Sequence, residues 1–102
     1  MSEPSLILSF QNEVKRNHIF EEDTFPSVQS LEEYEILIGK KLQYLIKNDQ
    51  HALTNLLYRI DVRERLTQEA FQEESVEAIA AVLARRVMER LQQKIELRER
   101  YK

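Results

Sequence analysis

The sequence of 102 residues contains no cysteine and no tryptophan, a single glycine and only two prolines. The absence of cysteine excludes a disulfide framework, a thiol nucleophile and a thiolate metal site. Tight turns between strands usually need glycine, proline or Asn-Gly pairs, so a chain this poor in turn residues does not favour a sheet. Leu, Glu, Gln, Lys and Arg are abundant and are good helix formers. Together these features predict an all-α fold.

The composition suits one small globular unit. With 42% hydrophobic and 32% charged residues, the chain is too apolar for a disordered protein and too polar for a membrane protein. We therefore expect a single helical domain over residues 1–102, with a flexible start at 1–4. The amino terminus lacks the basic region of a signal peptide, and the apolar run 6–8 is too short to span a bilayer. We expect a cytoplasmic protein that does not associate with membranes.

Apolar periodicity predicts a bundle of four to five helices, at about 5–17, 30–47, 49–60, 61–72 and 75–100. The residues expected to begin the last four are Ser30, Asp49, Asp61 and Ser75. Ser30 and Glu33 form a capping-box pattern, and Pro26 interrupts a connector at 18–29. Residues 5–10 also fit a strand, but a lone strand would have no partner in this chain.

The second predicted helix, 30–47, has two apolar faces. Leu37 and Tyr44 lie seven residues apart, outside the main apolar stripe, which is typical of a helix that is central or shared with a partner. Gly39 lies inside this helix, where glycine costs about 1 kcal/mol relative to alanine. Close packing of a crossing helix would explain the glycine, and the alternative is a residue that is merely tolerated.

The last predicted helix, which follows its cap Ser75 and covers 76–100, is amphipathic and about 38 Å long, longer than a domain of this size needs. Its apolar residues recur every four positions, so the stripe rotates along the helix axis. The second half is therefore expected to overhang the core and to pair with a second copy in a homodimer. The candidate interface residues are Leu37, Tyr44, Met88, Leu91 and Ile95.

Positive charge is concentrated in the same helix. The chain has a net charge of −3, whereas residues 85–102 contain seven basic and three acidic side chains, a local net charge of +4. A row with a spacing of four, Arg86, Arg90, Lys94 and Arg98, provides candidate contacts to nucleic acid or another polyanion. The alternative, which the interspersed glutamates favour, is that these side chains flank a helix–helix seam.

The sequence contains no pattern typical of a catalytic, cofactor-binding or metal site. Neither His18 nor His51 has a glutamate three residues before it, so the metal-binding Glu-x-x-His pattern of helical bundles is absent. A phosphate-binding loop needs glycines at set spacings, which one glycine cannot supply. We expect a non-enzymatic protein-interaction or structural domain that self-associates through its C-terminal helix.

Residues 44–46, 48–49, 53 and 56–62, followed by a long charged helix, resemble a group of short uncharacterised bacterial all-helical proteins of unknown function. The resemblance covers about the carboxy-terminal two-thirds of the chain. It implies a bacterial, cytoplasmic, stand-alone helical protein and assigns no site residues.

Overall fold

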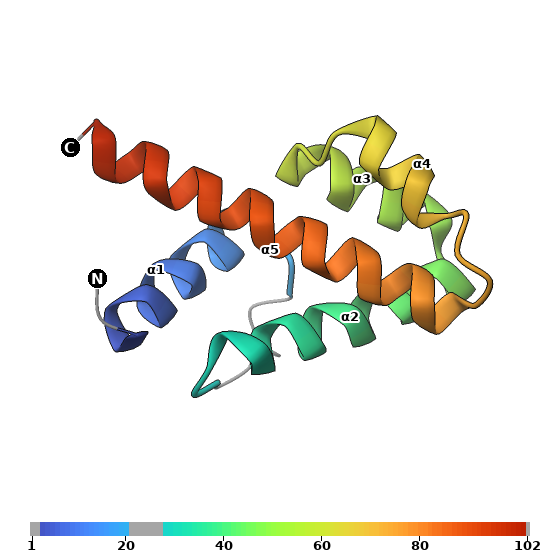
Figure 1. Cartoon of the computed structure of the whole chain (residues 1–102), viewed down its shortest axis with the longest axis horizontal. Helices are drawn as coiled ribbons and strands as arrows, with labels where there is room; N and C mark the ends of the chain where they lie inside the picture. The colour runs from blue at the N-terminus through green and yellow to red at the C-terminus, as the bar shows by residue number, and fades with distance from the viewer. Residues whose placement is uncertain (1–2, 21–27, 102) are drawn as a thin grey trace.

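The computed structural model describes residues 3–20 and 28–101, and within these ranges it contains helices and no strands. The helices are α1 (Glu3–Arg16), α2 (Leu31–Asn48), α3 (Gln50–Ile60), α4 (Glu64–Ala70) and α5 (Val76–Arg100) (Figure 1). The predicted all-α bundle with a long C-terminal helix is confirmed. The strand alternative for residues 5–10 is wrong, because they lie in α1, which already begins at Glu3 within the stretch expected to be a flexible start.

Three of the predicted helix starts are confirmed by side-chain caps. The Ser30 hydroxyl accepts a hydrogen bond from the Glu33 amide at 3.2 Å, the Asp49 carboxylate accepts one from the Ala52 amide at 3.0 Å, and Ser75 caps α5 in the same way. The second hydrogen bond of the expected capping box, from a backbone amide to the Glu33 carboxylate, is shifted by one residue. The Glu33 carboxylate accepts from the amide of residue 29 at 2.8 Å and not from that of Ser30.

The predicted start of α4 at Asp61 is wrong. Asp61 instead ends α3, in the left-handed conformation with φ 67° and ψ 48°. Its amide donates to the carbonyl oxygens of Leu57 and Tyr58, as is typical of a residue that terminates a helix in this conformation. Helix α4 begins only at Glu64 and has no side-chain cap.

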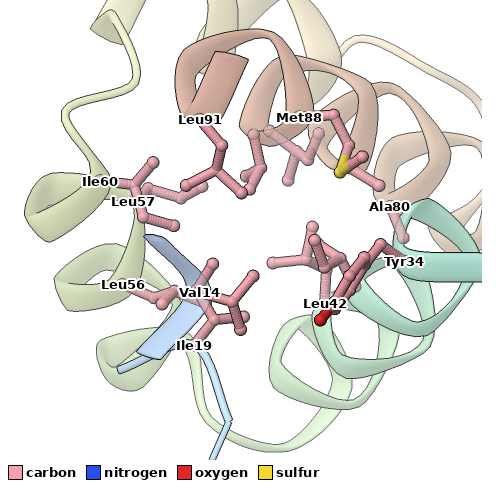
Figure 2. Packing of buried hydrophobic residues seen from close by; sticks show 14 of the residues in the cluster. Val14, Ile19, Tyr34, Leu42, Leu56, Leu57, Ile60, Ala80, Met88 and Leu91 are labelled. Carbon is pink, nitrogen blue, oxygen red and sulfur yellow. The ribbon is translucent and has the colours of Figure 1, made fainter. Parts of the chain in front are cut away.

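Helix α5 crosses the molecule and contacts each of the other four helices (Figure 1). Its inner face packs mainly on α2, with α3 and α4 beside it, and its C-terminal half also meets α1. Figure 2 shows buried side chains from these elements converging, among them Val14 of α1, Tyr34 of α2, Ile60 of α3 and Leu91 of α5. The rotating apolar stripe of α5 is therefore the consequence of packing against different helices in turn.

The expectation that the second half of α5 overhangs the core is wrong. Leu91 is 0% exposed and Ile95 is 4% exposed. Phe10 and Val14 of α1 are equally buried and belong to the same core cluster, so α1 of the same chain occupies the seam that was expected to receive a second copy. The periodicity showed that the seam needs a partner, but not which helix supplies it.

Gly39 lies where α2 crosses α5. A methyl group built at Gly39 would lie 3.8 Å from the Ala84 side chain, an ordinary van der Waals contact. Helix α5 is therefore the expected crossing helix, but it leaves room for a methyl group at position 39, so its packing does not require glycine there. Across residues 3–20 and 28–101, none of the helices combines the length and the apolar character needed to cross a membrane.

Candidate interaction surfaces

The cationic row of α5 is directed toward partners within the chain. Arg98 forms an ion pair with Glu13, a carboxylate that is only 1% exposed, and Arg16 contacts the same carboxylate at 3.1 Å. Lys94 Nζ donates to the Asn17 side-chain oxygen at 2.9 Å. Burial, and then the nearby Arg90, lower the pKa of Lys94. These contacts fasten the C-terminal half of α5 to the end of α1.

Further arginines tie the turns to the helices. Arg90 donates to the Asp61 carbonyl and forms an ion pair with its carboxylate, each at 3.2 Å. Arg59 of α3 donates to the carbonyl oxygens of Asn17 and His18 at 3.3 and 3.2 Å. Both arginines thus donate to carbonyl oxygens that lie just past the end of a helix.

All four members of the predicted polyanion site therefore have intrachain partners, since Arg86 pairs with Glu89 at 3.1 Å on its own helix. The pairings with Glu13, Asp61 and Glu89 offset part of the positive charge. The structural alternative, in which the basic side chains flank a helix–helix seam, describes Arg98 and Lys94 well. Polyanion binding by this row stays a prediction.

The structure separates the predicted interface residues into two groups. Leu91 and Ile95 are buried in the chain's own core and Met88 is only 9% exposed, so as folded these residues present little surface to a second copy. The other two, on α2, remain accessible: Tyr44 is 62% exposed and Leu37 is partly buried. Helix α2 lies along one edge of the molecule, with its outer face turned away from α5 (Figure 1).

Leu37 and Tyr44 belong to a regular row on that face. Glu33, Lys40 and Lys47 complete it, so the row has the alternating spacing of four and three residues that is typical of a coiled-coil seam. Glu33, Lys40 and Lys47 are all exposed. We call these five residues the α2 outer row.

A groove that sequence reasoning missed lies between α1, α2 and α5, with a volume of about 750 Å³. Its apolar lining residues are Phe10, Leu31, Ile36 and Met88, and its carboxylates are Glu32, Glu35, Glu89 and Glu96. We call this the acidic groove. The sequence patterns indicate a cap for Glu33 and a helix–helix seam beside the glutamates of α5, but no shared site. No local pattern indicates that the two pairs face the same depression.

A second, smaller groove lies between α3 and α4 and has a volume of about 370 Å³. Leu53, Leu57 and Val62 line it, together with Tyr58 and Phe71, whose side chains are 86% and 42% exposed. Glu64 is its only charged lining residue among those the structure describes. The charge of this groove therefore does not indicate which kind of partner would bind there.

No metal centre emerges from the described part of the chain, where no three histidine or acidic side chains come close enough to hold an ion. His18 and His51 are both exposed and far apart in sequence. Comparisons of the chain with protein-family models, curated proteins and solved structures find no match. The resemblance to a bacterial group stays a prediction, and the functional argument rests on the residues of this chain.

Proposed function

We propose that this protein is a non-enzymatic interaction domain that self-associates through the α2 outer row. The observation that carries the proposal is the row itself, in which Leu37 and Tyr44 repeat at seven residues on a helix face that stays partly or fully exposed among the described residues. A tyrosine that is 62% exposed beside a leucine on such a face is typical of a helix that pairs with another helix.

The charges of the row favour an antiparallel pair of α2 helices related by a two-fold axis near Lys40. In that arrangement Glu33 of one copy lies opposite Lys47 of the other, and Leu37 lies opposite Tyr44. The two helix dipoles are then also antiparallel. An isologous contact of this kind is self-complementary and closes at two subunits.

Two features limit the affinity. The two copies of Lys40 approach each other near the axis, where a polar residue lowers stability while fixing the register. Their aliphatic stems can cover Tyr44 while the ammonium groups reach water. Lys47 also has an intrachain partner, Glu77, at 3.8 Å, but both side chains are more than half exposed and that pair contributes little. We therefore expect a micromolar dimer.

Sedimentation equilibrium across a concentration series tests the proposal. Wild type should change from monomer to dimer, whereas Tyr44→Glu should remain monomeric because it places a charge in the seam. The matched control is Tyr58→Glu on α3, which changes an even more exposed tyrosine and should leave the dimer intact. A Lys40→Leu variant should dimerise more tightly than wild type.

The measurement has outcomes that refute the proposal. If wild type stays monomeric at high micromolar concentration, the α2 outer row does not mediate self-association and the proposal is refuted. Equal weakening by Tyr44→Glu and Tyr58→Glu would place the contact elsewhere. Circular dichroism of each variant checks that its helices are retained.

A further inference from the structure

The acidic groove combines an apolar floor with a rim of one charge sign. Phe10 and Met88 are buried at its base, whereas Ile36, at its edge, is 58% exposed. Neither lysine nor arginine is among the described residues that line the groove. An exposed apolar surface rimmed by polar residues is typical of a binding site.

The rim carboxylates are largely uncompensated. Glu89 pairs with Arg86, but among the described residues no ion pair involves Glu32, Glu35 or Glu96. Glu96 accepts a hydrogen bond from the Gln92 side chain at 3.1 Å, which leaves its charge in place. The groove therefore repels nucleic acid and anionic lipid and attracts a cationic ligand.

A helix is the cationic ligand that suits this shape. The groove follows the spaces between three helices, and apolar side chains at positions i, i+3 or i+4, and i+7 of a fourth helix would reach the floor. Lysine or arginine on both sides of that apolar stripe would then approach the glutamates of α2 on one wall and those of α5 on the other.

From this geometry we infer that the acidic groove binds a basic amphipathic helix of a partner protein. The contact uses Ile36 and the glutamate pairs, and not Leu37 or Tyr44. It is therefore independent of the self-association through the α2 outer row.

Fluorescence anisotropy with a labelled leucine-lysine helical peptide of about 18 residues tests the inference. One control peptide has the same composition but a scrambled order that destroys the apolar stripe, and a second has glutamate in place of lysine. The intact 102-residue chain should bind the first peptide, should bind the scrambled peptide at least about tenfold more weakly, and should not bind the acidic peptide.

Two pairs of variants locate the contact. Glu35→Lys with Glu96→Lys should weaken binding by about tenfold or more, because each change replaces attraction with repulsion. The control, Glu69→Lys with Glu73→Lys, makes the same change in net charge on α4 and just after it, and should have little effect. Ile36→Gln should weaken binding by about fivefold, whereas Tyr58→Gln on α3 should not.

Equal affinity for the ordered and scrambled peptides would overturn the inference, because it would indicate attraction to net charge alone. Equal effects of the two charge-reversal pairs would do the same. If Glu35→Lys with Glu96→Lys reduces the sedimenting mass of the protein without peptide, a second copy occupies the groove and a partner helix does not. Peptide binding that persists in the monomeric Tyr44→Glu variant separates this result from the test of self-association.

Discussion

Replacing Glu13 by glutamine should loosen α1 from the rest of the domain. The Glu13 side chain is 1% exposed and accepts from Arg16 and from Arg98, which lies 85 residues further along the chain. An amide of the same shape keeps the packing but has no negative charge, so it holds the two guanidinium groups more weakly. The contact between α1 and the C-terminal half of α5 should therefore weaken without a change of side-chain volume.

The magnitude follows from the exposure of the two arginines. Breaking a fully buried ion pair by removing one partner costs about 3–5 kcal/mol. Here Arg16 and Arg98 are 52% and 53% exposed, so water can solvate both once the carboxylate is gone. The variant loses two charge-assisted hydrogen bonds, and solvation of the arginines offsets part of that loss. We therefore expect the free energy of unfolding to fall by about 1–2 kcal/mol. For a domain of this size the melting temperature should fall by about 5–15 °C.

Chemical denaturation and amide hydrogen exchange measure the two parts of this prediction. The variant should lose stability, and exchange should accelerate more in α1 than in α2 or the first half of α5. Glu69→Gln is the matched control, because its pair with Arg65 is long, at 3.8 Å, and exposed. If Glu13→Gln and Glu69→Gln unfold at the same denaturant concentration, the buried carboxylate does not fasten α1 and the reasoning is refuted.

Three further substitutions have defined outcomes. Gly39→Ala should stabilise the protein by about 0.5–1 kcal/mol in denaturant titrations, because the added methyl meets Ala84 at an ordinary contact distance while the helix loses a glycine; destabilisation would contradict this. The Tyr34 hydroxyl is buried without a partner among the described residues, so Tyr34→Phe should be neutral or stabilising at pH 7. Burial raises the pKa of Tyr34 above its usual 10.0. Above about pH 10 the tyrosine of the unfolded chain loses its proton first, so the folded wild type loses stability as pH rises through the folded-state pKa. The advantage of Tyr34→Phe should therefore grow above pH 10, and a constant difference would refute the assignment. At Asp61, substitution by glycine should leave the protein about 1 kcal/mol more stable than substitution by alanine in thermal melts, because φ is positive there and both variants lose the contact with Arg90.

Local physical rules were sufficient to predict most of the helices. The caps at Ser30, Asp49 and Ser75 are specified within four residues of chain, so the sequence contains the whole of each interaction. Asp61 shows the limit of such rules. The same residue type that caps a helix start also tolerates the left-handed conformation that ends one, and the contact with Arg90 that favours the second role comes from α5.

The interaction surfaces were less predictable because they depend on contacts between distant segments. The pattern on α5 indicated that Leu91 and Ile95 pack against another helix, but periodicity does not specify whether that helix is intrachain or belongs to another molecule, and the expectation of a second copy at these residues was wrong. The acidic groove could not be predicted for the same reason, since Glu35 and Glu96 come together only in the folded bundle. In contrast, the spacing of Leu37 and Tyr44 on one helix face is visible in the sequence, and their role in self-association stays a prediction.

The most direct test of the proposed function is a mixing experiment with two charge variants of the α2 outer row. Glu33→Lys leaves only lysine at the two ends of the row, and Lys47→Glu leaves only glutamate, so each variant alone should sediment as a monomer. An equimolar mixture should form a heterodimer, because antiparallel pairing then places the lysines at the two ends of one row opposite the glutamates at the two ends of the other. A mixture that remains monomeric while wild type dimerises, or variants that dimerise individually as well as wild type does, would contradict the proposed pairing.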